Sequence, residues 1–110
     1  MSSRQTCTHP IYVILSKSRD SKKKYDARIG HKTISFGAKG MSDYTLHKDA
    51  LRKDRYIKRH SRRESWGKSG LETPGFWSRW LLWNLPSKKA SMHDMAKRFC
   101  LNIKQSRERS

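Results

Sequence analysis

TPGFWSRWLLWNLP, residues 73–86, holds three of the four tryptophans of this 110-residue chain. Thr73 suits the N-cap of a helix, and Pro74 suits its first position because a proline there loses no intrahelical hydrogen bond. Pro86 stops simple continuation of that helix. The pattern predicts a short helix that begins at Pro74, and everything else in the chain is interpreted around it.

Apolar residues recur at helical spacing within this stretch and again near the C-terminus. Phe76, Trp80 and Trp83 fall at i, i+4 and i+7. Trp77, Trp80 and Leu81 fall at i, i+3 and i+4, so apolar side chains together cover most of the helix and must be buried on more than one side. A last helix, capped by Ser87, repeats apolar residues in the same way. The predicted tryptophan-rich core consists of Phe76, Trp77, Trp80, Leu81, Met92, Met95 and Phe99.

The N-terminal half carries strand patterns. Ile11–Leu15 is β-branched and aromatic and predicts a strand buried on both faces. Apolar residues alternate with polar ones over 25–29 and again over 34–36, on either side of a tight turn at Gly30. These segments predict a three-stranded antiparallel meander with one apolar face to be covered, and Gly37–Gly40 is interpreted as a plain turn after it.

The whole chain is therefore expected to form one small α+β domain over residues 11–100, with the meander followed by three helices. The first helix is expected over residues 44–63, capped by Ser42 or Asp43. Residues 1–10 are polar and predict an N-terminal arm, and residues 101–110 predict a C-terminal tail. Both ends are expected to be flexible or ordered by a partner.

Charge is the strongest indication of a partner. The chain has 26 Lys and Arg against 9 Asp and Glu, a net charge of +17. Nucleic acid, acidic protein surfaces and anionic lipid are the natural counterparts of such a chain. The candidate anion- or partner-binding residues, most of them on the 44–63 helix, are Lys39, Arg52, Lys53, Arg55, Lys58, Arg59, Arg62 and Arg63.

Other residue patterns carry less chemistry. Trp66 and Trp83 are candidate aromatic anchors for a protein partner, because tryptophan is enriched at binding hot spots. Cys7 and Cys100 match no metal-ligand spacing, and whether they pair is left open. No catalytic or metal-binding constellation is found, so neither an enzyme, a cofactor nor a small-molecule substrate is expected. No stretch approaches a membrane span or a signal peptide.

Several motifs together resemble a known family. The residues that carry the resemblance are KTISFGAKG at 32–40, SDYT at 42–45, HKD at 47–49, RYI at 55–57 with RH at 59–60, and GFWSRWLLWN at 75–84. They are similar to a family of small basic proteins of uncharacterised function from nucleocytoplasmic large DNA viruses, of the iridovirus, marseillevirus, mimivirus and phycodnavirus type. The resemblance covers residues 32–99, and Glu72 and Pro74 depart from its usual pattern.

The resemblance implies a viral protein found in the virion, and before assembly at replication sites in the host cytoplasm. The expected function is that of a basic minor capsid protein that binds other viral capsid proteins, the major capsid protein above all. The alternative is a sequence-independent DNA-binding protein that neutralises and packages the viral genome. The resemblance implies no catalytic residues.

Overall fold

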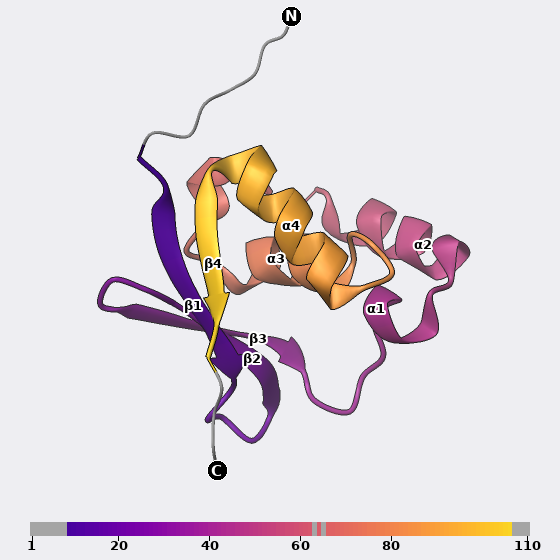
Figure 1. Ribbon diagram of the computed structural model, residues 1–110. Coiled ribbons are helices and arrows are strands. Elements are labelled where there is room, and N and C mark those ends of the chain that lie inside the picture. The colour runs from indigo at the N-terminus through magenta and orange to yellow at the C-terminus, as the bar shows by residue number, and fades with distance from the viewer. Residues whose placement is uncertain (1–8, 63, 65, 107–110) are drawn as a thin grey trace, which may run out of the picture.

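Helices cover one face of a four-stranded sheet in the computed structural model, which describes residues 9–62, 64 and 66–106 (Figure 1). The α+β class is thus confirmed, with more elements than expected. In chain order they are β1 (Ile11–Lys17), β2 (Lys23–Ile29), β3 (Lys32–Ala38), α1 (Tyr44–His47), α2 (Ala50–His60), the 3-10 turn η1 (Lys68–Gly70), α3 (Pro74–Trp77), the π-helical segment η2 (Ser78–Leu82), α4 (Lys88–Phe99) and β4 (Leu101–Gln105).

The sheet has the strand order β3-β2-β1-β4. The predicted antiparallel meander is present in β1, β2 and β3, but β4 pairs in parallel with β1, so the sheet is mixed. The prediction of a polar tail from residue 101 was wrong for this segment. Cys100 adopts a left-handed conformation (φ 57°) after α4, which turns the chain back so that Leu101, only 5% exposed, joins the core.

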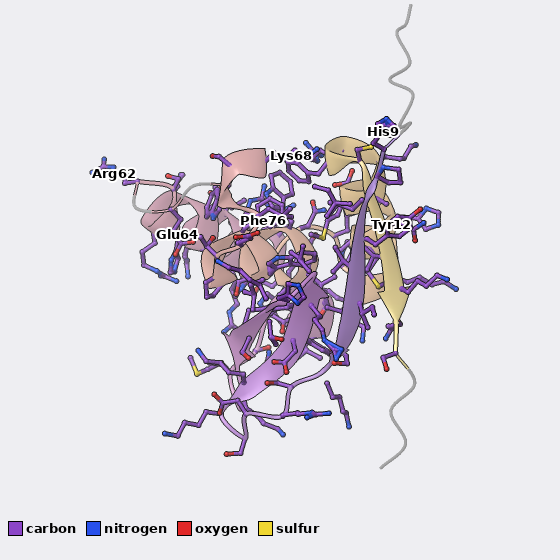
Figure 2. All side chains as sticks on the ribbon, turned by 90° about the vertical axis from the view of Figure 1, so that its left-hand side faces the viewer. His9, Tyr12, Arg62, Glu64, Lys68 and Phe76 are labelled. Carbon is purple, nitrogen blue, oxygen red and sulfur yellow. The ribbon has the colours of Figure 1, made fainter. Side chains whose placement is uncertain are left out.

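Strand β1 is buried on one face only, whereas its sequence predicts burial on both faces. Val13 and Leu15 are each 1% exposed beneath the helices, whereas Tyr12 and Ile14 are 66% and 44% exposed on the other face. Figure 2 shows the Tyr12 side chain projecting outward, while Phe76 lies inside the molecule. The reason is that α3, η2 and α4 pack on the same side of the sheet, which leaves its second face without a covering layer among the described residues.

The predicted core is confirmed in its main members. Phe76, Trp77, Leu81 and Met95 are fully buried, Phe99 is 9% exposed, and Trp80 and Met92 pack half-buried against them. Thr73 caps the helix through its side chain and Pro74 opens it, as expected. The Trp77 indole N–H donates to the carbonyl of Leu71 at 2.8 Å, so this buried ring also leaves no polar atom unpaired.

The expected 44–63 helix is instead two helices. Asp43 caps α1, and the chain leaves helical geometry at Lys48, whose φ is 55°. Asp49 then starts α2 by accepting a hydrogen bond from the Leu51 N–H at 3.0 Å. Aspartate competes with the helical backbone in this way, which favours a cap over a helix interior. Arg63, at the expected C-terminal end, lies outside the described residues.

Asp26 is a buried acid on the sheet face away from the helices, 8% exposed. Its carboxylate accepts hydrogen bonds from the Ser18 and Ser35 hydroxyls, both at 2.6 Å. Burial alone would raise the pKa of Asp26, but these hydrogen bonds outweigh it and hold the pKa below its usual value of 3.8. A carboxylate with a depressed folded-state pKa stabilises the fold above the unfolded-state pKa and loses that contribution as the pH falls.

We therefore expect Asp26→Asn to lower the free energy of unfolding at pH 7 by about 1 to 2 kcal/mol. The difference from the wild type should shrink as the pH falls below about 4, because the carboxylate of the unfolded chain then becomes protonated, and it should disappear as the pH falls through the lower pKa of the folded state. Urea unfolding between pH 7 and pH 3 measures both effects. The exposed Asp54→Asn is the matched control. A constant difference across this range would contradict the role assigned to the Asp26 carboxylate.

Candidate interaction surface on helix α2

An aromatic stack fixes helix α2 on the molecule. Tyr56, 7% exposed, is the one buried residue of α2. Its ring lies parallel to that of Trp83 at a centroid distance of 4.3 Å and stacks on His60 at 4.3 Å, with Trp66 further out at 6.3 Å. Burial, reinforced by the nearby Glu64 carboxylate, raises the pKa of the Tyr56 phenol. The outer side of α2 is thereby held in a defined orientation.

The two predicted aromatic anchors take part in this stack. Trp66 and Trp83 are half-buried, and the Trp66 indole N–H donates to Glu64 at 3.0 Å. Their packing is used to attach α2 to the tryptophan-rich core, and an additional role in anchoring a partner stays a prediction. The exposed apolar side chains of this region are Met41, Leu46 and Leu51, at 64%, 63% and 66% exposure.

Arg79 is a structural cation that was not among the predicted site residues. Its guanidinium lies over the rings of Trp80 and Trp66, 4.2 Å and 5.3 Å from their centroids, and donates to the Trp83 carbonyl at 3.0 Å. Burial lowers its pKa from the usual value. The available signal in the sequence was a single basic residue within an otherwise apolar segment. A cation in such a segment is stabilised when it lies over aromatic rings and donates to a carbonyl oxygen.

Lys53 faces inward, unlike the other candidate cations of α2. Its ammonium donates to the Asn84 carbonyl at 2.7 Å and lies 5.0 Å from the centre of the Tyr44 ring. Burial, followed by repulsion from Arg79, lowers its pKa. Lys53 therefore joins α2 to the segment after η2 and is not available to a partner.

Lys53→Met should accordingly affect stability and leave anion binding unchanged. We expect the free energy of unfolding to fall by about 1 to 2 kcal/mol, because the Asn84 carbonyl loses its partner while the apolar stem is kept. Urea unfolding measures this. Lys58→Met is the matched control, since its side chain is 78% exposed and, among the described residues, pairs only with Asp54. A Lys53→Met protein of full stability with weakened anion binding would refute this assignment.

Arginines line the outer side of α2. Arg52, Arg55 and Arg59 fall at i, i+3 and i+7, which places them along one side of the helix over about 10 Å. Arg62 continues the spacing just beyond the helix end, and Figure 2 shows it projecting outward. We call these four residues the arginine stripe. All are exposed, and within the described residues none has an ion pair or a hydrogen-bonded side chain.

The remaining predicted cations either lie away from the stripe or form contacts within the protein. Lys58 forms an ion pair with Asp54 at 3.4 Å. Lys39 is exposed in the turn after β3, between Gly37 and Gly40, both of which have positive φ values, so the plain-turn interpretation fits. Residues from the end of this hairpin and from α2 line a pocket of about 430 Å³, and Arg59 is one of them. Of the eight predicted residues, the structure therefore groups Arg52, Arg55, Arg59 and Arg62.

Metal clusters and membrane-spanning helices are absent from the described residues. Among them, no three histidine, cysteine or acidic side chains gather closely enough to hold a metal ion. None of the helices in this part of the chain has the length and apolar character needed to cross a bilayer. What the surface presents is a row of unneutralised guanidinium groups, with exposed apolar side chains on the same α1–α2 segment.

Comparison with known proteins finds that part of this arrangement is similar to a family. Residues 13–60, from β1 to the end of α2, match the model of a family described as "Family of unknown function (DUF5754)". The similar region thus includes most of the arginine stripe and ends before the tryptophan segment. No curated protein and no solved structure matches the chain.

Proposed function

We propose that this chain is a non-enzymatic structural component of a virus particle, a basic minor capsid protein that binds acidic surfaces of other capsid proteins. The viral assignment comes from the resemblance of residues 32–99 to proteins of large DNA viruses. The binding mode comes from the arginine stripe and the apolar side chains beside it. Its place would be the virion, reached from replication sites in the host cytoplasm.

One observation supports a protein partner over nucleic acid. Leu51 lies on α2 itself and Leu46 on the preceding α1, and both are more than 60% exposed next to an otherwise cationic segment. A phosphate backbone offers such leucines nothing to pack against. Protein interfaces, in contrast, combine arginine with apolar residues in a patch that water leaves on binding. The same segment therefore fits an acidic protein surface that also has an apolar centre.

Electrostatics supports an anionic partner of either kind. Neighbouring arginines such as Arg55 and Arg59 repel each other at i, i+4, and within the described residues no acid compensates them. An acidic partner would remove this repulsion and, with a net charge of +17 on the chain, would accelerate the encounter. The rigid attachment of α2 through Tyr56 means that little order has to be gained on binding.

The second candidate is sequence-independent DNA binding for genome packaging. The regular spacing of the arginine stripe supports it, because guanidinium groups repeated along one helix side suit the repeated phosphates of a duplex. Nothing in the chain resembles a motif that reads base edges, so such binding would be electrostatic alone.

Two measurements separate these functions. If the protein is a capsid component, mild chemical stripping of the particle shell should release it together with capsid proteins and leave the genome without it. Its retention on the genome would overturn the capsid assignment. In a titration against duplex DNA, the logarithm of the binding constant should fall with the logarithm of the salt concentration. For a packaging protein that neutralises six phosphates, the slope should be about −5. Loss of DNA binding at physiological salt would exclude packaging.

A further inference from the structure

Strand β4 forms an edge of the sheet. Within the described residues it pairs only with β1, in parallel. The Ile11 N–H donates to the Cys100 carbonyl at 3.1 Å, and the Ser106 N–H donates to the Leu15 carbonyl at 2.8 Å. Because backbone groups alternate between the two sides of a strand, the N–H and C=O groups of the even-numbered residues of β4 point toward β1. The N–H and C=O groups of Leu101, Ile103 and Gln105 therefore point away from β1, to an edge that no other strand of the described residues occupies.

A groove runs beside this edge, between β4 and helix α4, which lie next to each other in Figure 1. Its volume is about 530 Å³. Both apolar and basic side chains line it; the lining residues include Met92, Ala96, Leu101, Ile103, Lys88 and Lys89. The five residues of β4 span about 16 Å, enough for a short extended peptide.

We propose that this groove takes an extended acidic peptide segment of a partner protein, which adds as a fifth strand beside β4. The peptide backbone would satisfy the outward N–H and C=O groups of Leu101, Ile103 and Gln105. Alternate side chains of the peptide would enter the groove against Met92 and Ile103, as is usual for strand addition next to a helix. This is a second surface, separate from the arginine stripe, and it does not depend on the function proposed above.

The charge around the groove favours an acidic peptide over a second copy of the chain. Lys88, Lys89 and His93 line the groove, and none of the described residues that line it is acidic. Lys104 projects from the other face of β4. The Lys88 ammonium lies 4.6 Å from the centre of the Tyr25 ring, which orients it, and Lys89 is exposed. A second copy of the chain would bring a further +17 charge and another lysine-bearing edge, so like charges oppose edge-to-edge pairing. An acidic peptide meets no such opposition.

The test uses the full chain and a synthetic pentapeptide of alternating glutamate and valine with blocked ends. Strand addition predicts that the peptide slows hydrogen exchange at the Leu101, Ile103 and Gln105 amides, measured by NMR. A peptide of the same sequence, N-methylated at alternate residues, lacks the donors that the edge requires and should bind at least about tenfold more weakly. Equal binding of the two peptides would overturn the proposal, since charge alone would then explain it.

Two variants locate the site. Gln105→Pro removes one outward N–H and leaves the bonds to β1 from the neighbouring residues in place, so the fold should persist while affinity falls at least about fivefold. Lys89→Glu should weaken binding by a similar factor. Lys97→Glu, on the same helix but outside the groove lining, should have little effect. An equal loss from Lys89→Glu and Lys97→Glu would argue against the groove.

Other occupants give other results, and each contradicts the proposal. Protection of the Leu101, Ile103 and Gln105 amides that grows with protein concentration, without peptide, would assign the edge to a second copy. Protection in the dilute free monomer would assign it to another part of the chain itself. Peptide-induced changes confined to α2 would show that the acidic peptide binds the arginine stripe alone.

Discussion

Trp77→Ala is expected to lower the free energy of unfolding by about 3 to 5 kcal/mol. The Trp77 ring is fully buried and lies 5.9 Å from the ring of Phe36 on the sheet and 5.6 Å from that of Phe76, measured between centroids. Truncation leaves a cavity between sheet and helices and removes the hydrogen bond to the Leu71 carbonyl. Such a loss is a large fraction of the stability of a domain of this size.

Urea denaturation followed by far-UV circular dichroism measures the change. Tyr12→Ala is the matched control, because it also removes an aromatic ring from the chain but from an exposed site, 66% accessible. It should alter the free energy of unfolding by less than about 0.5 kcal/mol. If Trp77→Ala remained within 1 kcal/mol of the wild type, roughly the level of an ordinary substitution, the tryptophan segment would not be the centre of the core.

Features with short-range signals were predictable from the sequence. Thr73 caps α3 and Ser87 caps α4 as expected, because capping depends on residues only three positions apart. The burial of Phe76 and Trp77 followed from the apolar residues that recur at helical spacing around them, because such a helix has little polar surface to turn toward water. The hairpin turn at Gly30, with φ at 60°, likewise follows from one residue type.

Features that depend on distant partners were not predictable in this way. Strand β4 is short and its alternation weak, and it exists because β1, far away in sequence, offers an edge. The one-sided burial of β1 depends on where α3, η2 and α4 pack, which the strand itself does not encode. The break at Lys48 and Asp49 reflects a close competition between capping and helix continuation.

The candidate surface was likewise predictable only where it depends on local spacing. Helical spacing alone places Arg52, Arg55 and Arg59 on one side of α2. It does not reveal that Lys53 turns inward, because that depends on the Asn84 carbonyl, which lies in another element. Arg79 similarly needs the ring of Trp66 from outside its own helix. A cation count on the sequence therefore overestimates the part of the charge that faces a partner.

Replacing the four residues of the arginine stripe with glutamine should abolish most anion binding without unfolding the protein. None of these side chains has a partner within the described residues, so little stability is lost. For duplex DNA, the magnitude of the log–log salt slope should fall by about 3 to 4, one counterion per lost contact. For an acidic protein surface, the loss of four exposed ion pairs should weaken binding by about 30-fold.

The matched control removes the same total charge from sites away from α2. Its four substitutions are Lys17→Gln, Lys22→Gln, Lys68→Gln and Lys104→Gln, all at exposed positions. Because only the placement of the charge differs, this variant should retain most of the affinity for either partner. Equal weakening of the two variants would mean that net charge, and not the stripe, determines binding.

The exposed leucines decide between the two partners of the stripe. Leu46→Ser combined with Leu51→Ser keeps every charge and removes two apolar side chains that contribute little to the core, since each is more than 60% exposed. Binding to a capsid protein that covers these leucines should weaken by about tenfold for each leucine covered, because each buried leucine contributes about 1.5 kcal/mol or more. Binding to duplex DNA should not change, because phosphates do not contact apolar groups. Surface plasmon resonance against both partners measures the difference, and an unaltered affinity for the capsid protein would remove the reason for preferring it over DNA.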